Sequence, residues 1–219
     1  MTLHLYAIVD RRPRSAEALG KGIARRPLSL VRAGGAYVVV ELAEPREPTP
    51  AALVAYDRVI RRIARLVPSV LPLRFGSTAA DRAALQALIG PLAGSLARAF
   101  ERVRDAVQFT LRVRGRRDSA MPASAITGGP GTRWLVERLA RHQVPEIASV
   151  TDATRPFVRE ARAVRHDRGT HFASVYHLVA RDDVSGWRSA LARSSKELPR
   201  GITLTTTGPW PPWAFAELA

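Results

Sequence analysis

The chain ends in a stretch that combines prolines with large aromatic residues, TGPWPPWAFAELA at residues 207–219. Each proline fixes its own φ angle and pushes the residue before it towards an extended conformation, which excludes a regular helix or a central strand here. The sequence therefore predicts a stiff, extended segment from Gly208 to Trp213. The residues of this segment that we expect to contact the chain itself or a partner are Pro209, Trp210, Pro211, Pro212, Trp213 and Phe215.

The composition of this tail, residues 208–219, argues against a free chain end. Disordered tails are typically polar, whereas Trp210, Trp213 and Phe215 offer large apolar surfaces and lose little conformational entropy when they dock. Two interpretations are open: a strap that closes the chain's own core, and a peptide that docks on a partner. Because a predicted strand delivers the tail from a sheet edge, we expect it to cross its own chain towards the first domain.

The composition places the chain among globular proteins. It has 219 residues, of which 46% are apolar, enough to bury the core of one large or two small domains. No run approaches 18 consecutive apolar residues and the first residues lack a basic region, so we expect neither a transmembrane helix nor a signal peptide. Cysteine is absent, which excludes disulfides, thiolate metal sites and cysteine nucleophiles and is compatible with a cytosolic protein.

The chain is strongly basic, with a net charge of +15. Of its 34 basic residues only Lys21 and Lys196 are lysine. A strong positive field favours acidic partners such as nucleic acids, anionic membranes or acidic proteins. The arginines are spread along the chain, however. A GC-rich genome, whose codons favour arginine over lysine at exposed positions, would produce the same composition.

The first hundred residues predict an α+β domain. Thr49 is a candidate N-cap with Pro50 at the first helical position, and Thr78 is a candidate cap for a later helix. Leu53, with other apolar residues at helical spacing, is expected on the buried face of the helix after Pro50. Strands are expected over residues 3–9, 28–32 and 36–42, and helices over 15–26, 50–67, 79–89 and 92–103.

Between these helices lies a short apolar run, VLPLRFGST at residues 70–78. Pro72 predicts an edge strand or a bulge. Arg74, Phe75 and Gly76 are expected to form a structural turn after it. An arginine between apolar residues is normally held by a carboxylate or by carbonyl groups, so we expect Arg74 to pin this turn and to be structural before it is functional.

The second half predicts a β–α–α–β–α–β order, which is typical of a ferredoxin-like domain. Arg155, Arg159, Arg162 and Arg165 would form a basic stripe on its second helix, and Asp182 or Asp183 would cap its last helix. The expected elements are strands over residues 106–113, 172–179 and 201–207, a loop over 115–132, and helices over 133–142, 155–165 and after 183.

The fold class is therefore α+β, with two small α/β-sandwich domains and a proline- and tryptophan-rich tail. The expected boundaries are residues 1–104 for the N-terminal α+β domain, 105–207 for the ferredoxin-like domain and 208–219 for the tail, which docks on the chain's own domains.

No set of polar residues converges on a recognisable chemistry. His171 and His177 are too far apart for an obvious metal pair, and the other histidines are scattered. The glycine-rich stretch 128–132 lacks the Gly-Lys-Ser/Thr ending of a phosphate-binding loop. We therefore assign no catalytic, cofactor-binding or metal-binding residues, expect no cofactor, and expect a protein that is not an enzyme.

Nucleic-acid binding is the alternative. A basic ferredoxin-like sheet is the shape of an RNA-recognition module, which stacks bases on exposed aromatic residues. The candidates here are Phe109, Phe172 and Tyr176, although the basic-aromatic motif of such modules is missing.

Several of these pieces resemble one family, the gas vesicle proteins F/L. The ending TGPWPPWAF (207–215) is similar to that family's Thr-Gly-Pro-Trp-Pro-Pro-Tyr-x-Phe ending, and VLPLRFGS (70–77) to its Pro-x-Arg-Phe-Gly-Thr segment. The opening strand with YAIV (6–9) and the YHLV of residues 176–179 fit as well. The resemblance spans nearly the whole chain. Trp213 stands where tyrosine is usual, and the middle region lacks the long charged helices of many members.

The resemblance implies a two-domain, non-enzymatic accessory protein of gas vesicle formation. Members of the family are expected to contact the small hydrophobic shell protein during nucleation or growth, together with other accessory proteins, and some become minor vesicle components. It implies a cytoplasmic, vesicle-associated location, with no specific nucleic acid and no membrane as partners. A sheet edge or an apolar groove would suit such a contact. The alternative is a basic nucleic-acid-binding module with a ferredoxin-like sheet.

Overall fold

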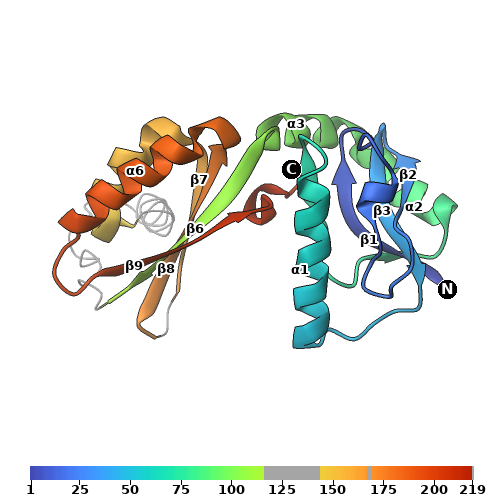
Figure 1. The fold of residues 1–219 in the computed structure, drawn as a ribbon, viewed down its shortest axis with the longest axis horizontal. Coiled ribbons are helices and arrows are strands. Elements are labelled where there is room, and N and C mark those ends of the chain that lie inside the picture. The colour runs from blue at the N-terminus through green and yellow to red at the C-terminus, as the bar shows by residue number, and fades with distance from the viewer. Residues whose placement is uncertain (116–143, 167–168, 219) are drawn as a thin grey trace, which may run out of the picture. The chain divides into compact units, whose positions relative to one another are not determined.

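The computed structural model describes residues 1–115, 144–166 and 169–218. The chain divides into two compact units. Unit 1 comprises Met1–Val107 and Trp210–Ala219, and unit 2 comprises Gln108–Pro209. Each unit contains one antiparallel sheet with helices, which confirms the α+β class (Figure 1). The predicted helix over 133–142 and almost all of the predicted loop over 115–132 lie outside the described residues.

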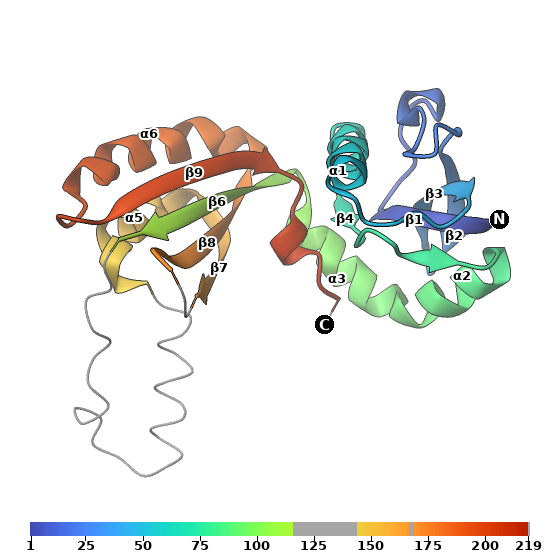
Figure 2. The ribbon, with the colours of Figure 1, turned by 90° about the horizontal axis from the view of Figure 1, so that it is seen from below.

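In unit 1 the sheet has the strand order β2-β3-β1-β4, and β5 also pairs with β1. Figure 2 shows α1 on one face of this sheet and α2 and α3 on the other. The strands are β1 (Thr2–Val9), β2 (Ser29–Ala33), β3 (Ala36–Ala43), β4 (Val70–Pro72) and β5 (Thr78–Ala79). The helices are α1 (Pro50–Ala64), α2 (Arg82–Ile89) and α3 (Ala93–Val103).

The start of α1 confirms the predicted cap. The Thr49 hydroxyl accepts a hydrogen bond from the Ala52 N–H at 3.2 Å, and Pro50 is the first helical residue. Tyr56, Ile60 and Ile63 are buried as their spacing predicts. Leu53 is not: its side chain is 45% exposed, because it belongs to the first turn of α1 and the core begins only at Tyr56.

The helix predicted over residues 15–26 is wrong. Only the short 3-10 helix η1 (Glu17–Leu19) forms there. The following loop is fixed by Glu41 of β3, which is fully buried and accepts hydrogen bonds from the backbone N–H groups of Ala24 (3.2 Å) and Arg26 (3.0 Å). Satisfying a buried carboxylate in this way outweighs the weak helix propensity of a segment that contains two glycines.

The predicted cap at Thr78 is also wrong. Thr78 lies in β5, where its backbone pairs with His4 of β1. The N-cap of α2 is Asp81, whose carboxylate accepts a hydrogen bond from the Ala84 N–H at 2.8 Å. Pro72 lies in β4, the last strand on the main path of the sheet, so the predicted edge strand is confirmed.

A single helical stretch in the described residues, Arg82–Val103, passes the length and composition test for a membrane span, with a mean hydropathy of 1.2. This is weak evidence for a membrane span, because helices packed in the core of a soluble protein pass the same test. The 3-10 helix η2 (Gly90–Leu92) interrupts the stretch, and Leu85 and Leu96 are fully buried against the rest of unit 1.

In unit 2 the sheet has the strand order β7-β8-β6-β9. Its strands are β6 (Ala106–Arg114), β7 (Val158–Arg165), β8 (His171–Ala180) and β9 (Thr203–Trp210), and the first two residues of β6 and the last of β9 belong to unit 1. Its helices are α5 (Ala148–Thr154) and α6 (Val184–Ser194), with short 3-10 segments η4 (Pro145–Ile147), η5 (Arg155–Phe157), η6 (Arg181–Asp183) and η7 (Ser195–Glu197).

The helix predicted over residues 155–165 is wrong: after the 3-10 turn η5 at residues 155–157, the rest of this stretch is the strand β7. Arginine, alanine and glutamate favour a helix locally, but β7 pairs along its length with β8, and this non-local ladder decides the conformation. The predicted basic stripe is therefore not a helix face. Arg165 instead forms an ion pair with Glu146 (2.6 Å), and Arg162 forms one with Glu160 (3.0 Å).

The other elements of unit 2 agree with the sequence more closely. β8 forms as predicted, and Asp183 occupies the N-cap position of α6, although its side chain makes no capping hydrogen bond. β9 does not end at Thr207 but continues through Pro209 to Trp210. Pro209 is tolerated there because β9 is an edge strand.

Candidate functional site

The C-terminal tail packs within unit 1. Pro211, Pro212 and Phe215 are buried, Phe215 completely, and Trp213 is partly buried against the core cluster beneath α1. The backbone turns into the 3-10 helix η8 (Trp213–Phe215), where the Phe215 N–H donates to the Pro212 carbonyl at 3.0 Å. η8 contacts α3 and β4.

Trp210 and the exposed Pro209 precede the buried part of the tail. The guanidinium of Arg61 on α1 lies 3.8 Å from the centre of the Trp210 ring. Asp57, one turn earlier, holds Arg61 through an ion pair of 2.5 Å. A planar cation over an indole is attracted by the negative face of the ring, so Asp57 and Arg61 together position Trp210.

Arg102, near the end of α3, holds the backbone of the tail. Its Nη2 donates to the carbonyl oxygens of Phe215 (3.0 Å) and Glu217 (2.8 Å). Charge-assisted hydrogen bonds of this kind are stronger than neutral ones. Together with the burial of Phe215, they show how the tail is held within unit 1.

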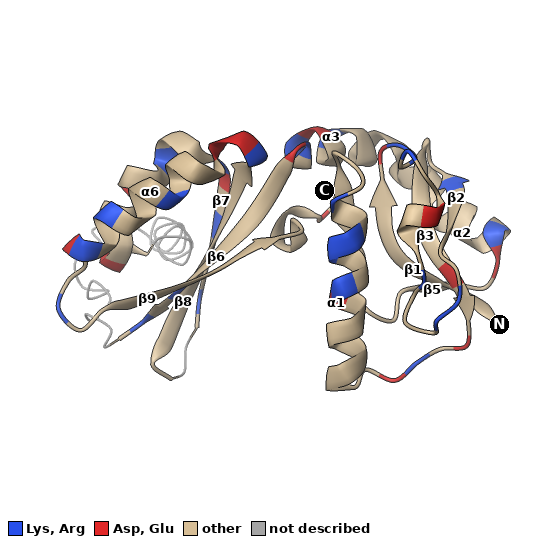
Figure 3. Cartoon of the chain, viewed as in Figure 1, with Lys and Arg blue, Asp and Glu red and all other residues tan. Residues whose placement is uncertain are grey.

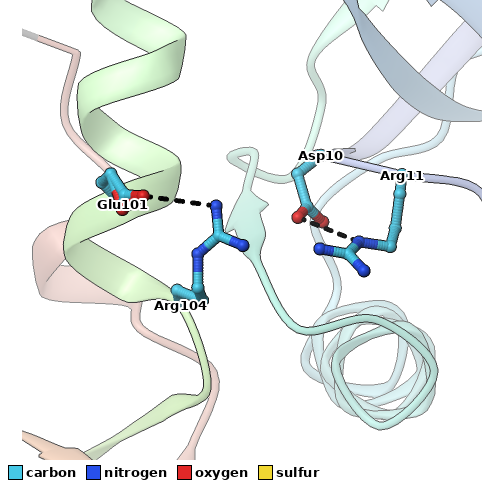
Figure 4. Close-up of polar contacts among 4 residues, drawn as sticks. All are labelled: Asp10, Arg11, Glu101 and Arg104. Carbon is cyan, nitrogen blue, oxygen red and sulfur yellow. Dashed lines mark hydrogen bonds and ion pairs between the residues drawn. The ribbon is translucent and has the colours of Figure 1, made fainter.

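Other ion pairs of unit 1 are weaker. Figure 4 shows Arg104 with Glu101 (3.5 Å) and Arg11 with Asp10 (3.3 Å). Each pair includes a well-exposed arginine, so each contributes at most about 1 kcal/mol to stability. Neither pair therefore marks a site.

The predicted turn at residues 74–76 lies beside the aromatic residues of the core. Phe75 contacts Tyr56 edge to face with ring centres 5.3 Å apart, and Tyr56 stacks on Tyr6 at 4.9 Å. Gly76 has a φ angle of +86°, a conformation that favours glycine. The Tyr56 hydroxyl lies 2.9 Å from the Leu73 carbonyl oxygen and 3.0 Å from that of Leu5, which ties the turn to β1.

The guanidinium of Arg74 does not lie in an apolar setting. The residue is exposed, and its backbone carbonyl, not its side chain, accepts the hydrogen bond from the Ser77 N–H (3.1 Å) that closes the turn. The Tyr56 hydroxyl also anchors this turn, through the Leu73 carbonyl group. Burial raises the pKa of the Tyr56 hydroxyl, which therefore remains a proton donor throughout the ordinary pH range.

Unit 1 contains a second buried polar group, Tyr6 with Glu41, which the sequence analysis did not predict. The Tyr6 hydroxyl donates to Glu41 at 2.6 Å and accepts from the Ile23 N–H at 2.9 Å. Burial and the hydrogen bond to Glu41 raise the pKa of Tyr6. A Cβ atom at Gly22 would lie 2.3 Å from the Glu41 carboxylate, so glycine is needed where the loop crosses this pair. The arrangement is structural, since every partner is internal.

Unit 1 also exposes apolar side chains. Leu53 and Val54, adjacent in the first turns of α1, are 45% and 51% exposed, and Leu88 on α2 is 55% exposed. Single exposed apolar residues are normal, but two neighbours at a helix start form a small apolar surface. Periodicity alone placed Leu53 in the core, so only the structure reveals this surface.

The candidate RNA-stacking residues are not available as a set. Phe109 and Phe172 are both 1% exposed, and Phe109 stacks on Trp187 of α6 with ring centres 4.1 Å apart. Tyr176 is partly exposed. Bases stack on exposed rings, so this sheet offers at most one of the three. Figure 3 shows basic residues on elements of both units, not gathered on one.

Within the described parts of the chain, no group of three or more histidine and acidic side chains is placed to hold a metal ion. One association that sequence missed does occur in unit 2. His166, which the sequence analysis left among the scattered histidines, and His171, which it considered only with His177, have ring centres 4.5 Å apart and share Ser174 as a hydrogen-bond partner. The hairpin of β7 and β8 brings them together. The sequence analysis predicted a helix over residues 155–165, so it did not expect the hairpin and could not bring the two histidines together.

Comparisons with known proteins agree with this architecture. The profile of the family described as gas vesicle synthesis protein GvpL/GvpF matches residues 2–133 and 131–217. The crystal structure of GvpF from Microcystis aeruginosa matches with a TM-score of 0.78 and 16% identity, over 99% of this chain and 99% of that chain. GvpF from Anabaena sp. PCC7120 matches with a TM-score of 0.75 and 14% identity, over 100% of this chain and 97% of that chain. No curated protein sequence matched. At these identities the structures establish a shared fold.

Proposed function

The chain belongs to the gas vesicle synthesis protein GvpL/GvpF family, and from this premise we propose that it is a non-enzymatic accessory protein that binds the small hydrophobic shell protein of the vesicle. Binding would take place in the cytoplasm and at the vesicle, during nucleation or growth. Other accessory proteins of vesicle formation are the expected further partners. An apolar subunit that polymerises needs a partner that holds its exposed surface before it aggregates.

The observation that supports this proposal best is the apolar surface of α1, Leu53 and Val54. Both side chains point away from the core although they belong to a helix whose inward face is complete without them. An apolar pair at the start of a helix suits contact with an apolar helix of a partner.

Binding can be tested by pull-down of the shell protein with Leu53→Lys and Val54→Lys variants. We expect both to lose most of the bound shell protein while their thermal unfolding stays close to that of the parent chain. Leu88→Lys is the matched control, because Leu88 is exposed to a similar extent on another helix of unit 1. Equal losses in all three variants, or in none, would contradict the assignment of this surface.

We also infer three parts of the chain: an N-terminal domain (1–104), a ferredoxin-like domain (105–207) and a tail (208–219) that acts as a strap on the chain's own domains. The strand order β7-β8-β6-β9, with helices between the strands, supports the ferredoxin-like assignment. Limited proteolysis tests the boundaries. Rapid cleavage inside α1 with residues 115–132 protected would contradict them.

Nucleic-acid binding is the alternative hypothesis, and an oligonucleotide-binding experiment tests it against our proposal. A net charge of +15 produces nonspecific attraction to any polyanion. Binding to labelled oligonucleotides that disappears near physiological salt would agree with our proposal. Tight, sequence-selective binding with a steep salt dependence would favour the nucleic-acid reading.

A further inference from the structure

The face of α1 that points away from the core changes from apolar to cationic along its length. At its start it carries the apolar side chains of Leu53 and Val54. From there a stripe at helical spacing, which we call the outer stripe, runs along one side of the helix: Val54, Arg58, Arg61 and Arg65. Arg65 belongs to it because this C-cap residue keeps helical backbone angles. Figure 3 shows basic residues on the later turns of α1 and none on its first turn.

The arginines of the outer stripe differ in what they contact. Arg61 is paired with Asp57 at 2.5 Å. Arg58 and Arg65 are exposed, and neither side chain forms an ion pair, a hydrogen bond or a ring contact with any residue that the structure describes. Asp57 is also the one acidic residue in the sequence from 50 to 69. Two cations about 10 Å apart along the helix axis are therefore left without a carboxylate partner in the described part of the chain.

Charge argues against the chain itself as the occupant of the outer stripe. Two copies that met through this stripe would set arginine against arginine, and like charges repel. Residues 116–143 carry more arginines than acidic residues, and the whole chain has a net charge of +15. The complementary occupant is therefore a different molecule, which carries negative charge.

Among acidic partners, a protein helix suits the outer stripe better than a lipid surface or a nucleic acid. A helix that lies on a membrane inserts a continuous apolar face, whereas α1 turns Tyr56, Ile60 and Ile63 into the core. A nucleic acid is bound mainly through its phosphates, which offer no apolar partner to Leu53 and Val54. An acidic amphipathic helix presents apolar side chains and carboxylates on one face.

The spacing along α1 defines this partner further. Val54 and Arg58 are about 6 Å apart along the axis, and Arg65 lies about 10 Å beyond Arg58. We propose that the outer stripe binds an acidic amphipathic helix, with an apolar residue against Val54 and carboxylates four and eleven residues away paired with Arg58 and Arg65. This inference rests on the proposed function, under which the helix belongs to the shell protein.

Salt dependence is the first measurement. Ion pairs at an exposed surface are screened by salt, whereas an apolar contact is not weakened by it. Binding of the shell protein to the parent chain should weaken by about fivefold to tenfold between about 0.05 M and about 0.5 M NaCl, as the loss of two exposed ion pairs predicts. An affinity that stays constant over this range would overturn the inference.

Variants separate the outer stripe from the general positive charge of the chain. Arg58→Glu should weaken binding by about tenfold, because it replaces an attraction with a repulsion, and Arg65→Gln by about twofold to fivefold. Arg82→Glu is the matched control, because Arg82 is an exposed arginine of α2 on the other face of the sheet (Figure 2). It should change the affinity less than twofold. Equal effects of Arg58→Glu and Arg82→Glu would overturn the inference.

A designed helical peptide tests the outer stripe without the shell protein. The peptide carries leucine at one position and glutamates four and eleven residues away, and its control has glutamines in place of the glutamates. In NMR titrations of the full chain, the glutamate peptide should shift the backbone amide signals of residues 53–65. It should bind at least about fivefold more tightly than the glutamine peptide. Equal binding of the two peptides, or signal shifts confined to other residues, would overturn the inference.

The inference and the proposed function fail in different experiments. Shell-protein binding that is lost in Leu53→Lys but unaffected by salt and by Arg58→Glu would overturn the acidic helix and leave the proposed function standing. Binding of the glutamate peptide at α1 without any binding of the shell protein would contradict the proposed function and support the acidic helix, in another partner. Vesicles of phosphatidylserine and phosphatidylcholine that bind the parent chain but not Arg58→Glu would assign the outer stripe to a lipid surface and overturn the inference.

Discussion

Buried polar side chains at single positions decide much of the chemistry inside each unit. In unit 2 the indole N–H of Trp187 donates to Nδ1 of His177 at 3.1 Å. An indole can only donate, so this Nδ1 is an acceptor and the neutral ring carries its proton on Nε2. Both side chains are buried, and burial lowers the pKa of His177 to about 4.

This histidine predicts acid sensitivity. The unfolded chain has an ordinary histidine pKa of about 6.5, so between pH 6.5 and 4 the unfolded state binds more protons than the folded state. The contribution of His177 to the free energy of unfolding is therefore fully present above pH 6.5. It is lost as the pH falls, by about 3 kcal/mol at pH 4. His177→Gln keeps an acceptor for Trp187 but does not titrate. Urea unfolding at several pH values should show a smaller acid loss in the variant, whereas parallel profiles would contradict the argument.

Glu41 is the corresponding residue of unit 1. Its carboxylate accepts from the Tyr6 hydroxyl and from two backbone N–H groups of the loop after η1. Glu41→Ala leaves these buried donors unsatisfied, at a cost of about 1–3 kcal/mol for each group that water cannot reach. We expect a fall in the unfolding midpoint and faster proteolysis of the loop at residues 21–26. Glu44→Ala, at an exposed position, is the control and should change neither.

At the scale of elements, the sequence predicted what local patterns determine. The strand β8, the cap of α1 and most of its buried face, and the edge position of β4 all follow from residues close in sequence. β7 could not be predicted in this way, because VREARAVR has good helix formers and becomes a strand only by pairing with β8. The candidate site also has one part that the sequence predicted and one part that it did not. Prolines and aromatics marked the tail, while Arg61, Arg102 and the histidine pair are assembled by tertiary structure.

The start of α2 provides a test, because the N-cap was predicted at one residue and the structure has it at another. Thr78 was the predicted cap, but Asp81 accepts the hydrogen bond from the Ala84 N–H. Asp81→Ala should destabilise the protein by about 1 kcal/mol, the usual effect of removing an N-cap. Thr78→Ala should stay within about 0.5 kcal/mol, because its side chain is exposed. Chemical denaturation measures both, and a larger loss at Thr78 would show that the helix begins there.

At the scale of the whole molecule, unit 1 is not continuous in sequence. The chain leaves it after Val107, forms unit 2 and returns at Trp210. The hydrogen bond from Arg102 to the Phe215 carbonyl joins residues 113 positions apart. Phe215 has no exposed surface, so the last residues of the chain complete a core that the first residues begin.

A fragment experiment tests this dependence. Residues 1–107 alone lack Trp213 and Phe215, and burying a large apolar side chain contributes about 1.5–3 kcal/mol against a typical stability of about 5–15 kcal/mol. We expect the fragment to unfold at a clearly lower temperature than unit 1 does in the full chain. A synthetic peptide of residues 208–219 should bind the fragment and restore part of the loss.

The peptide also separates a strap from a free docking segment. Phe215→Ala in the peptide should weaken its binding to the fragment by about a hundredfold or more, because truncating a buried phenylalanine costs about 3–5 kcal/mol. If the fragment unfolds at the same temperature with and without the peptide, and the full chain without residues 208–219 loses only the shell protein, then the tail serves the partner and the strap is wrong.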